Sequence, residues 1–401
     1  MALLLWVLVL TQAPALRALT RYAPYPELAL LTLVLCVAAG LVLLFNPPQK
    51  LRELMFTAWP SALLLVVLSV AIAYVYPLAD GLKATLGGSD ANDAIQLGGA
   101  ALWQLSNPYA LTTYFGNPIS PGPGWLALLG PFALLGVQPL GVVAALGFAL
   151  FALRRAKMSW AMLNLITLAW ASSLAVWELS TVANDLPMFG LVLLGVVAML
   201  AQPRIPLPTL LFLAVVVGCL ATTRISFFYL PFLVGFSLFA VWPRRALWVA
   251  IVGGLTMLAW HSGFYWLNPQ GYPPFHLLGR GENLLGGPAL IGVLGVLGVT
   301  GIAMLYHWRW WNPYVHVALG LGVPLGVLSF AELANVGNFR NWEGATWLIP
   351  ALPIALMAVF TSWPLPRALS QGSQMPKKKT ISVSKNQTNP TKPLAKGKRS
   401  R

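Results

Sequence analysis

The stretch PSALLLVVLSVAIAYVYPL, residues 60–78, decides the fold class, because it holds no charged residue and is about as long as one membrane crossing. A helix needs roughly 20 apolar residues to cross the hydrocarbon core of a bilayer. Comparable runs recur along the 401 residues, of which 58% are hydrophobic and 9% charged, and the mean hydropathy is +0.74. Soluble globular domains do not reach this composition. Because a helix pairs its own backbone polar groups inside lipid, the sequence predicts an all-α integral membrane protein.

Together with the apolar runs on either side of it, this stretch predicts about 12 transmembrane helices, within a range of about 10 to 13. They cover residues 2–19, 27–46, 60–78, 138–153, 159–177, 186–201, 207–222, 226–241, 246–262, 288–306, 312–331 and 345–362. The first run lacks the basic start of a signal peptide, so we expect it to be retained. We expect four parts: extra N-terminal helices at 1–59, a core at 60–245, variable C-terminal helices at 246–366, and a disordered basic tail at 367–401.

Basic residues gather in one set of the short loops between these runs. The set contains Lys50, Arg52, Arg154, Arg155, Lys157, Arg204, Arg244, Arg245 and Arg309. The positive-inside rule places such loops in the cytoplasm. The charges therefore predict a multi-pass protein of the plasma (inner) membrane, with nine of the ten acidic residues at the outer face. The clustered acids indicate that polar chemistry belongs to that face.

The C-terminal tail from Gln371 onward carries nine basic residues and no acid. Its Lys, Ser, Thr, Pro and Gln content cannot bury enough apolar area to fold. We expect it to lie in the cytoplasm, to fix the topology and to rest on anionic membrane lipids rather than to bind nucleic acid. The sequence assigns no oligomeric state.

Two acids stand close together in SDANDAIQLGGAALWQLSNPY, residues 89–109. Ser89 or Asn92 can cap a helix that begins near Asp93. In the first turn Asp93 feels the positive end of the helix, which favours its ionised form and suits it to accept a proton. The alternative is that Asp90 and Asp93 only cap and solvate a surface helix.

This helix belongs to the long first outer loop, residues 79–137, and is expected to end near Leu105. Glycine and alanine at 98–101 leave one side almost without bulk, so the helix can lie flat against other helices. The later run WLALLGPFALLG, residues 125–136, is short for a span and contains a proline. It predicts a re-entrant or interfacial element.

Two more charged residues stand at the outer ends of apolar helices. Asp185 comes just before an apolar run, where it either caps the helix or positions a cation or a sugar hydroxyl. Arg224 is the only charged residue between Arg204 and Arg244. Its guanidinium either holds a phosphate or snorkels to the surface at a turn.

These outer motifs occur in a recognisable order along the chain. They are Asp93 with AALW at 100–103, Pro108-Tyr109, Asn117-Pro118, Asp185 in NDLPM, and Arg224 ahead of Leu230-Pro231. Over roughly residues 60–245 the chain resembles the GT-C superfamily of polytopic glycosyltransferases that use polyprenyl-phosphate sugars, especially its bacterial mannosyltransferase-like branch. Asp93, rather than Asp90, matches the catalytic aspartate of that superfamily.

The resemblance implies an inverting hexosyltransferase that moves a mannose-like sugar from a polyprenyl-phosphate donor to a lipid or glycan acceptor. Asp93 would act as general base, and Arg224 would stabilise the leaving phosphate. Asp185 would orient the acceptor or hold a divalent metal, Mg²⁺ or Mn²⁺. The remaining candidate substrate-binding residues are Asp90, Tyr109, Glu178, Arg280 and Arg340.

A transporter or flippase of a lipid-linked or small polar substrate is the competing class of protein. In such a protein the same acids and arginine would line a transport pathway. Transporters usually carry internal repeats with broken helices at matching positions. The two halves of this sequence show no convincing repeat, and the acids lie in loops, which favours the transferase.

Overall fold

The computed structural model describes residues 2–17, 19, 25–45, 47–86, 90–267, 269, 272–275, 301 and 312–362. Within these residues the chain is helical, and its only extended pairing is an isolated bridge between Thr112 and Pro118. The elements are α1 (Ala2–Gln12), α3 (Pro26–Phe45), α4 (Gln49–Met55), α5 (Trp59–Leu86), α6 (Ala91–Trp103), η1 (Pro108–Ala110), α7 (Pro123–Leu134), η2 (Gln138–Leu140), α8 (Gly141–Arg155), α9 (Trp160–Ala171), α10 (Leu174–Thr181), α11 (Asp185–Leu200), α12 (Leu207–Ala221), η3 (Ile225–Phe227), α13 (Leu230–Phe239), α14 (Pro243–Leu267), η5 (Pro273–Phe275), α17 (Pro313–Val336), η7 (Glu343–Ala351) and α18 (Leu352–Ser362).

The described helices confirm an all-α, membrane-embedded protein, with fewer helices of spanning length than the sequence suggests. Four stretches are long and apolar enough to cross a membrane, and up to six if each of two bent helix pairs is one span. Of the expected spans, 186–201, 207–222 and 226–241 correspond to α11, α12 and α13, of 16, 15 and 10 residues. At about 1.5 Å per residue such helices reach only about 15–24 Å, short of the roughly 30 Å hydrocarbon core. The expected span at 288–306 lies outside the described residues, apart from residue 301.

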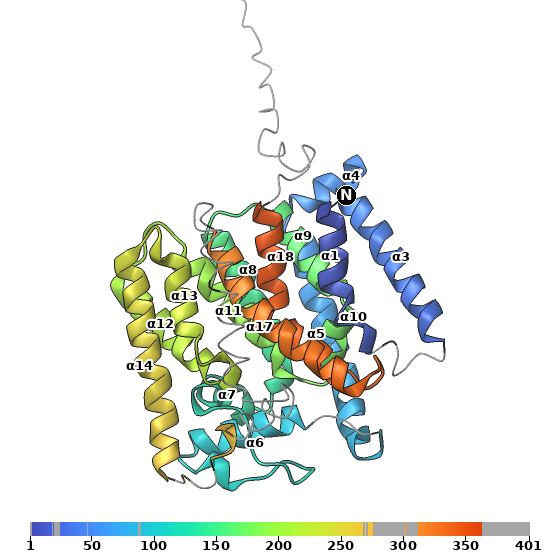
Figure 1. The fold of residues 1–401 in the computed structure, drawn as a ribbon. Helices are drawn as coiled ribbons and strands as arrows, with labels where there is room; N and C mark the ends of the chain where they lie inside the picture. The colour runs from blue at the N-terminus through green and yellow to red at the C-terminus, as the bar shows by residue number, and fades with distance from the viewer. Residues whose placement is uncertain are drawn as a thin grey trace, which may run out of the picture.

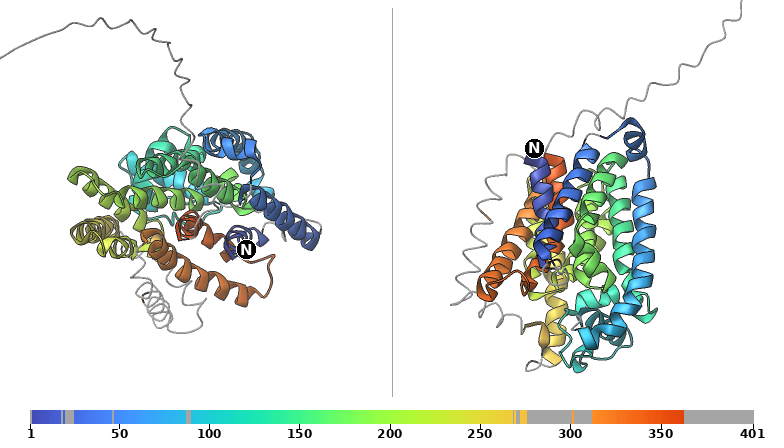
Figure 2. Two further views of the ribbon diagram at one scale, coloured as in Figure 1. Left: turned by 90° about the horizontal axis from the view of Figure 1, so that it is seen from above. Right: turned by 90° about the vertical axis from the view of Figure 1, so that its right-hand side faces the viewer.

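The surface of the bundle is apolar along its outer helices. On α5 the side chains of Leu63, Val70 and Tyr74 are 61%, 62% and 73% exposed, and Leu255 of α14 is 62% exposed. Contiguous apolar faces of this size are stable only in contact with lipid or a partner. Figures 1 and 2 show most helices running side by side, with α3 at the edge of the bundle.

The two ends of the bundle differ in character. Figure 1 shows α4 at one end and α6 at the opposite end. The basic residues Lys50 and Arg52 lie on α4, whereas α6 has Asp93 in its first turn and no basic residue in its last. The acidic first turn of α6 is therefore separated from the basic helix α4 by the length of the bundle (Figure 1).

A buried polar cluster fixes the start of α5. The amide of Asn164 on α9 donates to the carbonyl oxygens of Met55 and Thr57 at 2.8 and 2.9 Å. Its Oδ1 accepts from the hydroxyl and the backbone N–H of Ser61 at 2.6 and 3.2 Å. Because these polar groups are buried and paired, they hold one end of α5 rigidly against α9. The other end of α5 carries the candidate site.

The helix α6 begins two residues earlier than expected, at Ala91, and ends at Trp103. Asp90 occupies the N-cap position without a side-chain capping bond. The expected cap Asn92 is wrong, because Asn92 lies inside the helix and is buried, and Ser89 lies outside the described residues. Asp93 lies in the first turn, as the sequence predicts.

The smooth side of α6 packs on α7, as the glycines and alanines at 98–101 predict. A Cβ added at Gly99 would lie 3.2 Å from the Cα of Gly130 on α7, and one added at Gly98 would lie 3.1 Å from the side chain of Leu126. The helix α7 bends by 118° into the η2–α8 segment. This geometry is that of a broken span or a re-entrant loop, which agrees with the expectation from the short run at 125–136.

Candidate functional site

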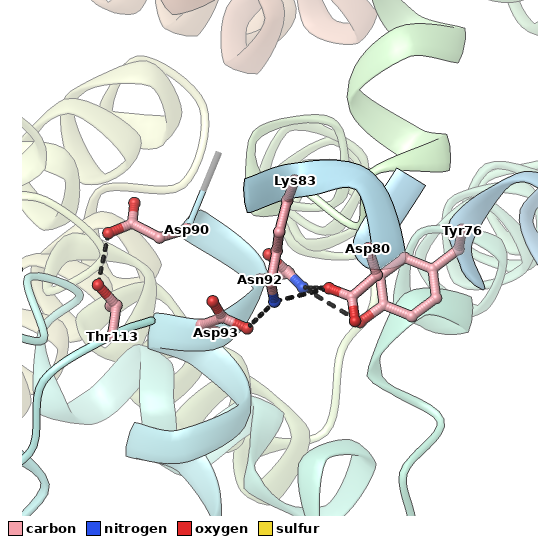
Figure 3. A network of polar contacts seen from close by, with 7 residues as sticks. All are labelled: Tyr76, Asp80, Lys83, Asp90, Asn92, Asp93 and Thr113. Carbon is pink, nitrogen blue, oxygen red and sulfur yellow. Dashed lines mark hydrogen bonds and ion pairs between the residues drawn. The ribbon is translucent and has the colours of Figure 1, made fainter. Parts of the chain in front are cut away.

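Two carboxylates share one ammonium group where α5 meets α6. Lys83 Nζ lies 2.8 Å from Oδ1 of Asp80, one turn earlier on α5, and 2.8 Å from Oδ1 of Asp93 on α6. The amide of Asn92 donates to Asp80 Oδ1 and to the hydroxyl of Tyr76, both at 3.1 Å. We call these five residues, Tyr76, Asp80, Lys83, Asn92 and Asp93, the carboxylate centre (Figure 3).

Among the described residues, two carboxylates of the carboxylate centre face one ammonium. The side chain of Asp93 is 15% exposed, and its Oδ1 is held by Lys83. Its Oδ2 is buried and has no hydrogen-bond partner among the described residues. A buried acceptor without a partner costs free energy. Among the described residues, Oδ2 therefore keeps its capacity to accept a hydrogen bond or a proton.

Lys83, Asp80 and Tyr76 are parts of the centre to which the sequence assigned no role. The apolar run ends near residue 78, whereas α5 continues to Leu86. The spacing of Asp80 and Lys83, three positions apart, is that of neighbours on a helix surface. In the sequence, this spacing indicates that the helix continues beyond its apolar part.

Asp90 does not belong to the carboxylate centre. Its Oδ2 accepts from the hydroxyl of Thr113 at 2.6 Å and from the amide of Asn117 at 2.8 Å. Figure 3 shows Asp90 directed toward Thr113, apart from the contacts around Lys83. The two acids, three positions apart in the sequence, thus hold different segments, and Asp90 anchors the loop that follows η1.

The second polar centre is a buried ion pair between Asp185 and Arg224. Asp185 is fully buried at the start of α11. Its Oδ1 lies 3.2 Å from Nη2 of Arg224, and its Oδ2 accepts from the indole N–H of Trp125 at 2.8 Å. The N-cap interpretation of Asp185 is wrong, because the preceding Asn184 caps α11 through the N–H of Leu186 at 3.0 Å.

Arg224 occupies the turn between α12 and η3 and is only partly used by protein partners. Its side chain is 19% exposed, and Nη1 donates to the carbonyl oxygen of Thr223 at 2.8 Å. A guanidinium has five N–H donors, and among the described residues those of Arg224 bond to Asp185 and Thr223. The ion pair with Asp185 thus fixes the side chain of Arg224 in this turn. An arginine that snorkels freely to the surface would not be held in this way.

The helix α7 joins the two polar centres. It packs against α6, which carries Asp93. Its Trp125 binds Asp185 through the indole, and the backbone N–H of Trp125 donates to the hydroxyl of Thr222 at 2.9 Å. The structure thus pairs Asp185 directly with Arg224, and α7 links this pair to the helix of Asp93.

Gly122 allows α7 to approach this closely. A Cβ at residue 122 would overlap the carbonyl oxygen of Thr222, a backbone atom that cannot turn aside. We expect Gly122→Ala to destabilise the protein by about 1–3 kcal/mol through overpacking, measured as a lower thermal unfolding temperature in detergent. Gly147→Ala on α8 is the matched control, since a Cβ there meets nothing within 4 Å. Equal unfolding temperatures for both variants would contradict the close docking of α7.

Tyr109 is a buried packing residue whose hydroxyl is hydrogen-bonded. Its hydroxyl donates to the carbonyl oxygen of Pro121 at 3.0 Å, and its ring meets those of Tyr272 and Phe264 edge-on at 5.1 and 5.6 Å. Burial, with Tyr272 nearby, raises the pKa of Tyr109 well above its usual value. The hydroxyl therefore stays neutral and holds the segment that precedes α7.

The other candidate residues lie elsewhere or outside the described part of the chain. Glu178 on α10 pairs with Arg17 at 3.5 Å, so this contact joins α10 to the segment after α1. Arg340 is exposed in the loop before η7. Arg280 lies outside the described residues. None of these contacts places Glu178 or Arg340 in either polar centre.

Asp185 is a poor fit for the divalent metal that the resemblance allows. Both of its oxygens are hydrogen-bonded, and one faces the positive charge of Arg224. A Mg²⁺ or Mn²⁺ ion at this carboxylate would have to displace that guanidinium. Within the described part of the chain, no group of three or more His, Cys, Asp or Glu side chains could hold a metal ion.

The fold and these two centres define a class: a helical membrane protein in which a short helix links the helix of an acidic centre to a buried aspartate–arginine pair. Comparison with known proteins extends this no further, since no family model, curated protein or solved structure matches the chain.

Proposed function

We propose that the protein is a membrane glycosyltransferase that moves a hexose, mannose-like, from a polyprenyl-phosphate donor to a lipid or glycan acceptor. One observation carries this proposal: α7 packs against the helix of Asp93 and also binds the Asp185–Arg224 pair through Trp125. Sugar transfer from a phosphate donor needs a base for the attacking hydroxyl and a fixed cation for the leaving phosphate. The two centres supply these two groups.

In the proposed reaction an acceptor hydroxyl attacks the anomeric carbon of the donor sugar from the face opposite the phosphate. The new C–O bond forms as the bond to the phosphate oxygen breaks, so the configuration inverts. The hydroxyl proton passes to Oδ2 of Asp93, which has no partner in the described part of the chain. The polyprenyl phosphate leaves with its extra negative charge facing the guanidinium of Arg224.

We further propose that the shorter apolar helices also cross the bilayer with their flanking segments, which gives about twelve crossings. The basic loops would then face the cytoplasm and the two polar centres the outer face of the plasma membrane. The placement of α4 and α6 at opposite ends of the bundle supports this topology (Figure 1). A lipid-linked donor fits an outer site, where nucleotide sugars are absent.

The test is reconstitution of the purified full chain in proteoliposomes with polyprenyl-phosphate [¹⁴C]mannose and extracted envelope lipids and glycans. We expect radiolabel to become covalently attached to an acceptor, with release of polyprenyl phosphate. A transporter or flippase would instead move labelled donor between leaflets and form no new glycosidic bond. Label that crosses the bilayer but stays on the polyprenyl carrier would therefore overturn the transferase proposal. Comparison of envelope glycans with and without the gene identifies the acceptor.

A further inference from the structure

Two exposed aromatic rings stand at the tip of the loop that Asp90 anchors. Tyr114 is 62% exposed and Phe115 is 42% exposed. Their rings meet edge-to-face, with centroids 5.4 Å apart. Exposed rings at a loop tip either enter the membrane interface or bind a ligand. The contacts around the loop decide between these uses.

The loop is held in one shape by its own backbone and by Asp90. Residues 112 and 118 form an antiparallel bridge, and the N–H of Thr113 donates to the carbonyl oxygen of Asn117 at 2.8 Å. Gly116 takes a φ of 75°, which favours glycine and closes the turn. The bonds from Thr113 and Asn117 to Asp90 join this turn to the start of α6. The aromatic tip is thus preorganised, so a ligand need not order it.

Tyr114 lies against the carboxylate centre. Lys83 Nζ sits 5.4 Å from the centroid of the Tyr114 ring, close enough for a cation–π contact. The same ammonium binds Asp80 and Asp93, each at 2.8 Å. The ring and the two carboxylates therefore surround one cation, and most of the ring stays exposed beside them.

We propose that Tyr114, backed by Phe115, forms a saccharide subsite for the acceptor, which makes that acceptor a glycan or glycolipid rather than a bare lipid alcohol. A pyranose ring has an apolar C–H face that suits an aromatic ring and a rim of hydroxyls that donate to carboxylates. The ring of Tyr114 offers a surface for the apolar C–H face, and the carboxylates of Asp80 and Asp93 offer acceptors for the hydroxyls. This subsite rests on the proposed function, since Asp93 is the base that the bound sugar hydroxyl would meet.

Photo-crosslinking identifies what lies on the ring. Tyr114→p-benzoylphenylalanine in the full chain is irradiated in native membranes, and the peptide adducts are weighed by mass spectrometry. We expect adducts that carry hexose mass increments. Tyr74→p-benzoylphenylalanine is the matched control, because Tyr74 is also an exposed tyrosine but lies on the apolar face of α5, and we expect phospholipid adducts there. Phospholipid adducts alone at Tyr114, or none with hexose, overturn the subsite.

Substitution provides a second readout in the proteoliposome assay. Tyr114→Ala should raise the KM for the glycan acceptor about tenfold while kcat stays near the wild-type value, and Tyr114→Phe should restore the KM because it keeps the ring. Equal KM values for all three proteins overturn the subsite but leave the transferase proposal intact. Transfer that survives loss of Asp93 overturns the proposed base, whatever Tyr114 binds.

Discussion

Asp93→Asn should lower the rate of hexose transfer by about 10²–10⁴-fold while the protein keeps its fold. A positioned general base contributes about this factor. The amide of asparagine has nearly the same shape as the carboxylate, and its oxygen can still accept from Lys83, but it cannot take the proton of the acceptor hydroxyl. Transfer is measured as radiolabel moved from polyprenyl-phosphate [¹⁴C]mannose to the acceptor, and folding by the thermal unfolding temperature of the purified variant.

Asp80→Asn is the matched comparison for this result. It removes the other carboxylate that Lys83 binds but leaves Oδ2 of Asp93 in place. We expect a loss of less than about tenfold, through poorer placement of the ammonium. If both variants lose activity equally and also unfold at lower temperature, the centre is a structural clamp between α5 and α6, and Asp93 is not the base.

Asp185→Ala should produce the largest loss of stability. The change leaves the guanidinium of Arg224 without its buried partner and the indole N–H of Trp125 without its acceptor. Removing one partner of a buried ion pair costs about 3–5 kcal/mol, because the remaining charge is uncompensated. We expect a clearly lower unfolding temperature in detergent and a smaller yield of monodisperse protein.

The double variant Asp185→Leu with Arg224→Met tests the physical cause. Replacing both charges by apolar side chains removes the uncompensated charge, so stability should recover most of the loss of the single variant. Hexose transfer should stay low in the double variant, because the phosphate-binding cation is absent. A double variant as unstable as Asp185→Ala would show that the two residues contribute independently and would contradict the pairing.

Much of the fold was predictable from residues 60–78 and the similar runs around them. Apolar composition alone requires lipid-facing helices, and the smooth side of α6 predicted its flat contact with α7. The described helices include four to six candidate spans, so the number of about 12 stays a prediction. Hydropathy measures how apolar a run is, whereas the helix ends are set by turns and caps, which shorten α11, α12 and α13.

The candidate site was predictable only in part. Asp93, Asp185 and Arg224 stood out as charges at helix ends, but Lys83 did not. The sequence placed the end of the helix at the end of its apolar run, and the last turns of α5 are polar. Asp185 resembled a cap because any carboxylate before a helix does, and its neighbour Asn184 performs that role equally well.

The sequence by itself determined the class of protein and the charged residues near helix ends. The reason is that the apolar composition and length of a segment decide whether it can form a helix surrounded by lipid. Only the tertiary structure decided which charges meet. Lys83 and Asp93 are ten positions apart in the sequence, and Asp185 and Arg224 are 39 positions apart, yet each cation contacts its acid in the folded chain. A carboxylate has a different chemistry beside an ammonium, beside a guanidinium and in water. Packing of the helices, including α7, decides which of these neighbours each carboxylate has, and the order of residues does not.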